Sequence, residues 1–500
     1  MRIAFCLTGP NDVNGPNAWL VRHLPLLRCY GAQPEVVYLS HQPDRPCAYR
    51  QALAADGFRI RTVKLERFTE ESVANIVHAL DPDLPDVFVP NHSVPAYYAA
   101  RFLRDAGVKT IGVLHSDDPY YDDIADVFVA GADTWRLSGV VAVSEYLARR
   151  AVDMQPDQIA VAYAPCGAPI PRVPCRRDGP TLRIVYVGRL VEYQKRITRV
   201  AHRLCDAAAM FPDVEAILYG DGEARDAVDQ ILAERSPDGR VRLGGCLSPS
   251  DVPAALQNAH AIVLLSDFEG LSMSLLEAMA AGLVPIVSRL RSGAAELVRN
   301  GENGLVIDGD DERVFADAVR LLTFDAERWE TMSANARQTI SDGGFTSEVC
   351  AERWMAFCSL LPTPLRRRRP GALPLSGTWG LPARSHRARG IEPHDRRLVD
   401  RQVEFAVRDA RPVYLWGAGA AGRVLLGSRP GWRGYLEAAI DSNEERQGTT
   451  WEAMPVVAPT ILESPSAERP FVIIASQSHS AIERELERRG FRPGLDFVAA

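Results

Sequence analysis

Short apolar runs alternate with longer amphipathic segments along the first part of the chain. The runs are about 4–8 residues long and rich in β-branched residues, and segments of helical length separate them. This alternation is typical of parallel strands joined by crossover helices. The expected strands in this part are residues 2–7, 35–39, 86–89, 110–114 and 140–143.

The same pattern restarts after residues 165–169, where two prolines flank a glycine. Amphipathic segments again separate short runs that are typical of buried strands. These runs are residues 182–187, 214–219, 241–243, 261–265 and 284–288. The first 362 residues are therefore predicted to form two α/β domains in tandem, residues 1–180 and 181–362.

A change in composition marks the end of the second domain. Residues 363–395 contain several prolines and no apolar periodicity, which predicts a linker. A third, smaller α/β domain is expected over residues 396–500. Its predicted elements are a helix over 396–410, a strand that runs into a glycine turn over 413–419, strands over 436–441 and 471–476, and a helix over 481–489.

Composition narrows the class of protein. The 500 residues carry a formal net charge of −7, which argues against a protein built to bind nucleic acid, because phosphate binding needs clustered positive charge. The nine cysteines are scattered and never form a CxxC pair, which favours reduced thiols over disulfides or a zinc site. No apolar run approaches the roughly 20 residues of a membrane span. We expect a cytoplasmic protein that is soluble or at most peripheral to a membrane.

The most informative segment joins a predicted strand to a predicted helix over residues 266–282. At such a junction the free backbone N–H groups of residues 270–274 favour an anion. Glu269 lies before the helix and Glu277 about one turn inside it, and carboxylates suit sugar hydroxyls. The alternative interpretation is that Glu269 is an N-terminal helix charge and Glu277 a solvated helix residue.

Two further loops follow predicted strands. Gly188 and Arg189 end one strand, and Lys195 follows six residues later, so two cations can reach one anionic group. Gly220 and Gly222 flank an aspartate at the end of the next strand, where glycine allows a ligand to approach closely. Taken alone, these loops are equally compatible with surface charges and an ordinary turn.

Together these elements resemble the retaining glycosyltransferases of family 4 over roughly residues 1–360. The most specific part is Glu269-x7-Glu277 followed by residues 278–287, and the other matches occur in the same order along the chain. They are Gly188-Arg189-Leu190 with Lys195, Gly220-Asp221-Gly222, Gly293 with Glu296-Leu297-Val298, and Asn303-Gly304-Leu305. The resemblance implies the GT-B architecture, in which two Rossmann-like domains face a cleft, with the acceptor side in residues 1–180 and the donor side in residues 181–362.

The resemblance also implies roles for these residues. Arg189 and Lys195 would hold the donor diphosphate and stabilise the leaving group, Glu269 would contact the transferred sugar, and Glu277 would bind the donor ribose. The backbone amides that complete the donor site would be those of Gly270, Leu271, Ser272, Met273 and Ser274. The implied donor is a nucleotide-diphosphate-sugar, and neither a metal nor another cofactor is expected. The acceptor would be a saccharide, a lipid-linked intermediate or a small molecule.

The first domain matches this family less closely. His115 ends a predicted strand, where the family often has a cleft residue near the reacting sugar, although a structural hydrogen bond is the alternative. Gly15 lies in the first loop and is assigned to the donor site. That loop departs from the family pattern, because Pro16 stands where relatives have a second glycine and removes a backbone donor.

The third domain carries Gly417-x-Gly419-x-x-Gly422 between a predicted strand and a helix, with Asp441 nineteen residues beyond the last glycine. This spacing is the dinucleotide fingerprint. The domain resembles small Rossmann-like domains attached to sugar-modifying transferases. Nucleotide binding and a structural or partner-binding role both remain open.

Residues 363–401 hold ten arginines against three acidic residues. This basic segment is either a solvated linker or a contact for a protein or an anionic membrane surface. The leading hypothesis for the whole chain is a retaining, metal-independent hexosyltransferase of glycan or glycoconjugate biosynthesis. The alternatives are a catalytically silent nucleotide-sugar scaffold and a GT-B enzyme that isomerises a nucleotide-sugar.

Overall fold

The computed structural model describes most of the chain. The described residues are 1–9, 15–66, 69–131, 133, 135–154, 159–248, 251–308, 312–365, 403, 406–407, 411–428, 430–463, 469–475, 479–491 and 496–499. The chain divides into two compact units, residues 1–64 with 75–373 and residues 65–74 with 374–500. The larger unit contains two parallel sheets, and the smaller unit contains one sheet.

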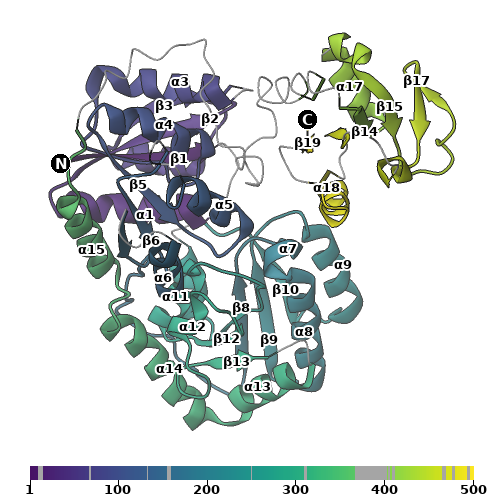
Figure 1. Ribbon diagram of the computed structural model, residues 1–500. Helices are drawn as coiled ribbons and strands as arrows, with labels where there is room; N and C mark the ends of the chain where they lie inside the picture. The colour runs from purple at the N-terminus through teal and green to yellow at the C-terminus, as the bar shows by residue number, and fades with distance from the viewer. Residues whose placement is uncertain are drawn as a thin grey trace. The chain divides into compact units, whose positions relative to one another are not determined.

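The first sheet has seven parallel strands in the order β3-β2-β1-β4-β5-β6-β7 (Figure 1). Its strands are β1 (Arg2–Gly9), β2 (Gln33–Ser40), β3 (Arg59–Lys64), β4 (Val87–Val89), β5 (Lys109–Leu114), β6 (Gly139–Ala142) and β7 (Ala160–Tyr163). The helices are α1 (Gly15–Cys29), α2 (Ala48–Ala55), α3 (Thr69–Leu80), α4 (Val94–Asp105), α5 (Pro119–Phe128) and α6 (Glu145–Met154), with a short 3-10 helix η1 (Asp81–Asp83). The strand order reverses between β1 and β4, and in open α/β sheets such a switch point marks the ligand crevice.

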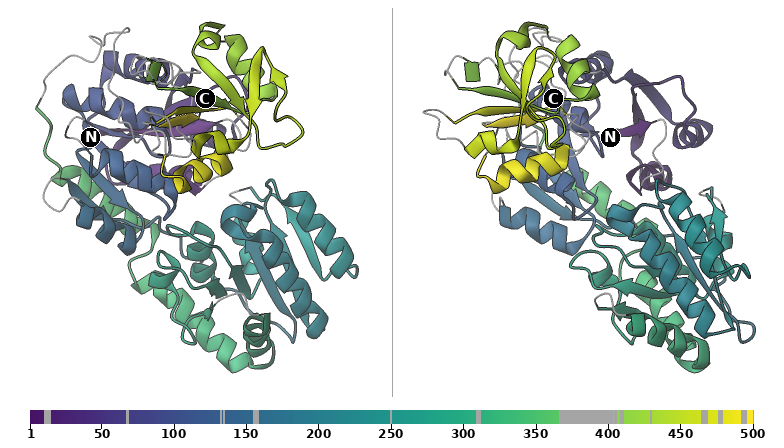
Figure 2. Two further views of the ribbon diagram at one scale, coloured as in Figure 1. Left: turned by 45° about the vertical axis from the view of Figure 1, so that its right-hand side comes forward. Right: turned by 90° about the vertical axis from the view of Figure 1, so that its right-hand side faces the viewer.

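The second sheet has six parallel strands in the order β10-β9-β8-β11-β12-β13, with helices on both faces (Figure 2). Its strands are β8 (Leu182–Val187), β9 (Val214–Tyr219), β10 (Val241–Gly245), β11 (Ala261–Leu264), β12 (Val284–Ser288) and β13 (Leu305–Ile307). The helices are α7 (Glu192–Lys195), α8 (Ile197–Met210), α9 (Arg225–Arg235), α10 (Val252–Gln257), α11 (Met273–Ala281), α12 (Ala294–Leu297), α13 (Glu312–Phe324) and α14 (Ala326–Asp342). The switch point lies between β8 and β11.

Helix α15 (Ser347–Leu360) follows the second sheet in the chain but packs beside α1 of the first sheet (Figure 1). The ring of Trp354 lies 5.4 Å from that of Trp19 and 5.9 Å from that of Phe5, centroid to centroid. Lys109 donates a hydrogen bond of 3.0 Å to the carbonyl of Cys358. The range 181–362 therefore includes a helix that completes the core of the first sheet.

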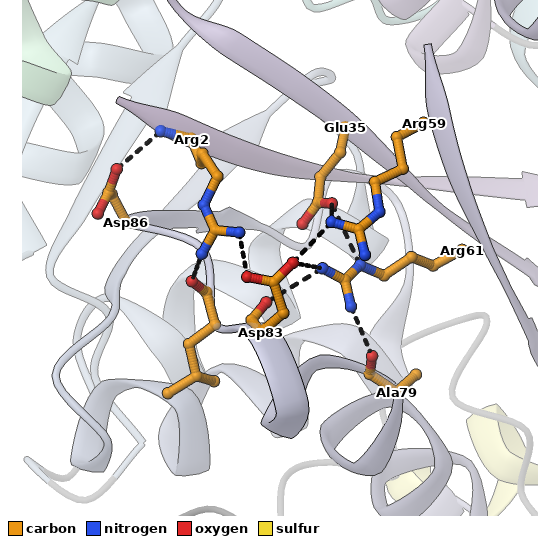
Figure 3. Close-up of polar contacts among 8 residues, drawn as sticks. Arg2, Glu35, Arg59, Arg61, Ala79, Asp83 and Asp86 are labelled. Carbon is orange, nitrogen blue, oxygen red and sulfur yellow. Dashed lines mark hydrogen bonds and ion pairs between the residues drawn. The ribbon is translucent and has the colours of Figure 1, made fainter.

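The amino-terminal edge of the first sheet carries an ion network (Figure 3). Asp83 accepts hydrogen bonds from Arg59, Arg61 and Arg2, and Arg61 also contacts Oε2 of the buried Glu35 at 3.1 Å. The hydrogen bonds, with that of Arg59 the largest contribution, hold the pKa of Asp83 far below its usual value. This network joins β1, β2, β3 and η1 at the edge opposite to the carboxyl ends of the strands.

The smaller unit contains a six-stranded sheet in the order β16-β17-β15-β14-β18-β19, parallel except for the β16–β17 pair. Its strands are β14 (Val413–Trp416), β15 (Leu436–Ile440), β16 (Thr450–Trp451), β17 (Met454–Val457), β18 (Phe471–Ile474) and β19 (Phe497–Ala499). The helices are α17 (Ala420–Ser428) and α18 (His479–Arg488), with 3-10 helices η4 (Pro430–Gly434) and η5 (Pro459–Glu463). Two layers of apolar side chains pack on the two faces of this sheet.

The predicted α/β class and all thirteen predicted strands are confirmed, with ends that shift by a few residues. The strands that the pattern did not predict lie mostly at sheet edges: β3, β7, β13, β16 and β19, together with β17 next to β16. Edge strands are half-exposed or short, so they lack a continuous apolar run. Residues 366–395 of the predicted linker, with its basic segment, and most of the predicted helix 396–410 lie outside the described residues, and the domain boundaries stay predictions.

Candidate functional site

Two glycine loops lie against each other at the carboxyl ends of β8 and β9. The amide of Gly188 donates to the carbonyl of Tyr219 at 3.1 Å, and the amide of Leu190 donates to that of Asp221 at 2.9 Å. A Cβ atom on Gly220 would lie 1.8 Å from the carbonyl oxygen of Gly188, and one on Gly222 would lie 2.4 Å from that of Leu190. The predicted glycines are therefore required by close backbone approach, whatever ligand they meet.

Of the two predicted cations, Arg189 precedes helix α7 and Lys195 is its last residue. Arg189 donates through Nη2 to Oε1 of the buried Gln194 at 2.7 Å, and Gln194 in turn donates to the carbonyl of Phe268 at 3.2 Å. Arg196 ends the helix in the left-handed conformation, with φ of 49°, which turns the chain directly into α8. The single turn of α7 thus holds Arg189 and Lys195 at the same edge of the sheet.

Lys195 forms an ion pair with Glu269 across this edge. Both side chains are nearly buried, with 11% of Lys195 and 7% of Glu269 exposed. Oε1 of Glu269 also accepts a hydrogen bond of 2.7 Å from the hydroxyl of Ser266. Partial burial strengthens such a pair because water screens it poorly. The structure thus brings one predicted phosphate ligand and one predicted sugar ligand into direct contact.

The segment 270–274 enters α11 as the sequence predicts. Ser272 is the N-cap and accepts a hydrogen bond from the amide of Leu275 at 3.4 Å, and its hydroxyl lies 3.1 Å from that of Ser274. The side chain of Leu271 is buried, and Met273 is the first helical residue. The free amides of this first turn favour an anion at the carboxyl end of β11.

Glu277 lies in the second turn of α11 and forms an ion pair with Arg22 of α1. Only 11% of its side chain is exposed, so the interpretation of a solvated helix residue is wrong. Burial lowers the pKa of Arg22, although its guanidinium stays charged at neutral pH. Arg22 of helix α1 is therefore the ion-pair partner of Glu277, the residue that the resemblance assigns to the donor ribose.

The first and second sheets approach each other at His115 and Gly270. A Cβ atom on Gly270 would lie 1.9 Å from the carbonyl oxygen of His115, so only glycine fits there. The carbonyl of Gly270 accepts a hydrogen bond of 3.0 Å from Ser292, whose hydroxyl also lies 2.8 Å from that of Ser144. His115 follows β5, and its Nε2 lies 2.7 Å from Oδ1 of Asn91.

An ion pair joins the two halves of this site. Arg291 forms two hydrogen bonds with the buried Asp117, at 2.6 and 3.1 Å. Burial, and after it the charge of Arg189, lowers the pKa of His92 to about 4. The charge of Arg189 thus acts on a histidine of the first half.

Gly15 is the first residue of α1 and is exposed, and residues 10–14 before it lie outside the described residues. Its assignment to the donor site stays a prediction. Sequence reasoning missed Asn91, Gln194, Ser266 and Arg22. Asn91, Gln194 and Arg22 contact partners on another loop or helix, so no local motif contained a signal for them. Ser266 lies in the predicted segment itself, three residues before its partner Glu269.

The glycine fingerprint of the smaller unit joins β14 to α17. Gly417 has a φ of 131°, and a Cβ atom on Gly422 would lie 2.3 Å from its carbonyl oxygen. Asp441 ends β15 and pairs with Arg446 at 3.2 Å, and Arg446 also donates to the carbonyl of Ala418 at 2.9 Å. The predicted residues therefore share one edge, where Asp441 and Arg446 are already paired with each other.

Among the described residues, no three His, Cys, Asp or Glu side chains gather in a group that could hold a metal ion. No helix in the same part of the chain is both long and apolar enough to cross a bilayer.

Comparison with known proteins identifies the second half of the site. Residues 175–339 match the family described as glycosyl transferases group 1. This part of the chain is therefore similar to group 1 glycosyltransferase domains. It contains the loops at Gly188 and Gly220, Arg189, Lys195, and both glutamates.

Curated relatives share this glycosyltransferase domain. The lipopolysaccharide core biosynthesis glycosyltransferase LpsE of Rhizobium meliloti is 30% identical over 179 residues, which are 36% of this chain and 50% of LpsE. The chain thus matches half the length of that relative. A putative colanic acid biosynthesis glycosyltransferase, WcaL of Salmonella typhimurium, is 27% identical over 353 residues, covering 62% of this chain and 83% of WcaL.

Solved structures extend the likeness beyond the glycosyltransferase domain. HepE of Anabaena, in complex with UDP and glucose, superposes with a TM-score of 0.59 at 18% identity, over 72% of this chain and all of HepE. TarM of S. aureus superposes with a TM-score of 0.58 at 12% identity, over 71% of this chain and 99% of TarM. The two larger sheets therefore have the GT-B fold.

Proposed function

We propose that the chain is a retaining hexosyltransferase that moves a sugar from a nucleotide-diphosphate-sugar to an acceptor in glycan or glycoconjugate biosynthesis. The observation that carries the proposal is the pairing of Lys195 with Glu269 beside Arg189, at the carboxyl edge of a group 1 glycosyltransferase domain. Cations that can bind phosphate and carboxylates that can accept hydrogen bonds from sugar hydroxyls occur together there, and a phosphorylated sugar needs both.

In this proposal the charge that develops on the departing nucleoside diphosphate is met by Arg189 and Lys195. Both cations are held before the reaction starts, one by Gln194 and the other by Glu269, so little reorganisation is needed at the transition state. The amides of the first turn of α11 would share that charge. Protein groups alone then supply the charge stabilisation, and no metal is required.

When the donor binds, the diphosphate competes with Glu269 for Lys195. Glu269 is then available to accept a hydrogen bond from a hydroxyl of the transferred sugar, while Ser266 keeps the carboxylate in place. Glu277 would accept hydrogen bonds from the ribose hydroxyls in the same way, in exchange for its contact with Arg22. The close approach of Gly270 to His115 would exclude water from the reacting carbon.

The acceptor is proposed to lie on the side of the first sheet, as a saccharide, a lipid-linked saccharide or a small molecule. Curated relatives named for lipopolysaccharide core and colanic acid biosynthesis favour a saccharide or a lipid-linked one. The location proposed for the protein is the cytoplasm, where nucleotide-sugars are made.

The test is a mass-spectrometric screen of nucleotide-sugars with the full chain, with and without a panel of acceptors. We expect one donor to be consumed, and NMR of the product should show the anomeric configuration of the donor. Arg189→Ala and Lys195→Met should each lower kcat at least 100-fold, the usual size of a lost electrostatic contact at a transition state. Glu277→Gln, which alters the ribose contact, should instead raise the KM for the donor.

Arg320→Ala is the matched control, because Arg320 lies exposed on α13 and pairs with Asp317 on the same helix. It should retain wild-type turnover. A product with the opposite anomeric configuration to the donor would refute retention. Loss of turnover with EDTA would refute metal independence. A rearranged nucleotide-sugar that forms whether or not acceptor is present would instead show an isomerase. Consumption of no donor would favour a silent binding protein.

A further inference from the structure

One side chain, Asn91, holds His115 at the carboxyl edge of the first sheet. Asn91 follows β4, and His115 follows the neighbouring strand β5. Oδ1 of Asn91 lies 2.7 Å from Nε2 of His115. Asn91 is fully buried, whereas His115 is only partly buried. The buried amide thus supports a ring that lies where the two sheets meet.

The orientation of the Asn91 amide follows from its second contact. Nδ2 donates a hydrogen bond of 3.1 Å to the carbonyl oxygen of Cys6 in β1. The reversed amide would set Oδ1 against that carbonyl oxygen, and two acceptors repel. Oδ1 therefore faces His115, and because it can only accept, Nε2 of His115 must carry the proton.

The backbone of Asn91 shows that this side chain is placed at a cost. Its φ is 55°, in the left-handed region that asparagine tolerates better than most residues but only glycine adopts freely. Its carbonyl accepts a hydrogen bond of 3.2 Å from the hydroxyl of the buried Tyr97. A buried residue held in this conformation is typical of a functional constraint.

The ring of His115 is neutral near pH 7. Burial, and after it the charge of His92, lowers the pKa of His115 to about 3. Other titratable groups at this edge include Tyr121, which lies 2.9 Å from Nδ1 of His92, and Arg189, whose charge acts on His92 from the second sheet. In the loop after His115, Asp117 is paired with Arg291 and Asp118 caps α5. A neutral ring with its proton on Nε2 presents Nδ1 as a hydrogen-bond acceptor.

We propose that Asn91 is a positioning residue that keeps His115 in the Nε2–H tautomer, so that Nδ1 accepts a hydrogen bond from a hydroxyl of the saccharide in the cleft. The proposal rests on the proposed glycosyltransferase function, because that function supplies the hydroxyl. An asparagine suits this task better than an aspartate, whose charge would favour the imidazolium and occupy Nδ1 with a proton.

The first test separates the side chain from the backbone. Asn91→Gly removes the amide, while glycine keeps the left-handed conformation without strain. We expect kcat to fall about 100-fold with little change in KM for the donor, as for a catalytic group misplaced by about 1 Å. The kcat of His115→Ala should be lower than that of the wild type by a similar factor. The kcat of the double variant should be no lower than that of His115→Ala alone.

Losses that multiply in the double variant would overturn the proposal, because Asn91 would then act independently of His115. The rate of donor hydrolysis by Asn91→Gly, measured without acceptor, shows whether Nδ1 of His115 binds a hydroxyl of the transferred sugar or of the acceptor. If hydrolysis falls together with transfer, the hydroxyl belongs to the transferred sugar. If only transfer falls, it belongs to the acceptor, and either result supports the role of Asn91.

The second test uses Asn91→Asp, which keeps an acceptor opposite Nε2. The added charge should raise the pKa of His115 and move the acid limb of the kcat profile to higher pH by at least one unit. A merely structural role would lower activity without moving that limb. His78→Gln, which replaces an exposed histidine of α3, is the matched control and should leave the profile unchanged.

The third test needs no donor. In the full chain labelled with ¹⁵N-histidine, the resonances lost in His115→Ala identify His115, and their shifts should be those of the Nε2–H tautomer. Asn91→Gly should convert them to a mixture of tautomers. An Nδ1–H tautomer in the wild type would overturn the proposal. If no nucleotide-sugar is consumed, the proposed function fails, whereas this measurement still decides the role of Asn91.

Discussion

Gly270 provides the sharpest test of how closely the two sheets approach in the working protein. Its φ lies outside the positive range, so alanine fits the local backbone. The obstacle is the neighbouring half, because the added Cβ would lie 1.9 Å from the carbonyl oxygen of His115 and 2.5 Å from its carbon. Gly270→Ala therefore changes one distance across the cleft while each sheet keeps its own packing.

The size of the effect follows from that distance. An ordinary Cβ contact begins near 3.4 Å, so the two loops must lie about 1.5 Å further apart in the variant. A displacement of about 1 Å at a reacting centre can cost about 100-fold in rate. We expect kcat/KM to fall by at least that factor, which corresponds to about 2.7 kcal/mol of transition-state stabilisation.

The assay is the initial rate of sugar transfer with the donor found in the screen, together with a thermal melt of the same sample. The melting temperature should change by no more than a few degrees. Gly427→Ala in α17 is the matched control, since a Cβ atom there meets nothing within 4 Å, and it should transfer sugar as the wild type does. Full activity in Gly270→Ala would refute the reasoning, because the closed contact would then play no part in turnover.

Three further changes test other contacts. Asp117→Ala removes the ion pair with Arg291 across the cleft and should raise the KM for the donor several-fold, measured by initial rates; an unchanged KM would exclude a role for that pair in closure. His23 is buried with its pKa lowered to about 3, so protonation of the unfolded chain should reduce stability as the pH falls below about 6.5, by up to about 1.4 kcal/mol per unit. His23→Phe should flatten the dependence measured by urea unfolding at pH 7.5 and 5, and an equally steep dependence in the variant would contradict this. Arg61→Met leaves the buried Glu35 without its 3.1 Å partner and should lower the free energy of unfolding by about 3 kcal/mol in the same assay, whereas a loss under 1 kcal/mol would show that Arg59 compensates.

Central strands could be predicted from the sequence because burial on both faces leaves an apolar run. β11 and β12 are buried throughout, and their predicted positions are confirmed within a residue. β3 could not be predicted, because it lies at a sheet edge and charged residues interrupt its apolar positions. Its two arginines form ion pairs in the network around Asp83 and Glu35. β13 was missed for another reason, because its three apolar residues are fewer than the four to eight of a recognisable strand run.

The candidate site shows a similar division. Lys195 and Glu269 could each be placed in a loop that follows a predicted strand, because each belongs to a short motif that begins at the end of that strand. Their ion pair spans 74 positions of sequence, and neither local motif contains information about it. Asn91 was missed for the same reason, because its importance lies in contacts with β1 and with the loop after β5.

The return of α15 to the first sheet has a consequence for exchanging parts between related enzymes. The chain crosses between the sheets twice, and the two crossing segments are hydrogen-bonded to each other. The amide of Ala168 donates to the carbonyl of Phe345 at 2.9 Å, and the amide of Ser347 donates to the carbonyl of Ala168 at 3.1 Å. The part of the chain that carries the second sheet is therefore inserted within the part that carries the first sheet. A chimera that exchanges the second sheet between related proteins should be joined near residues 168 and 346, so that Trp354 stays with the core of the first sheet.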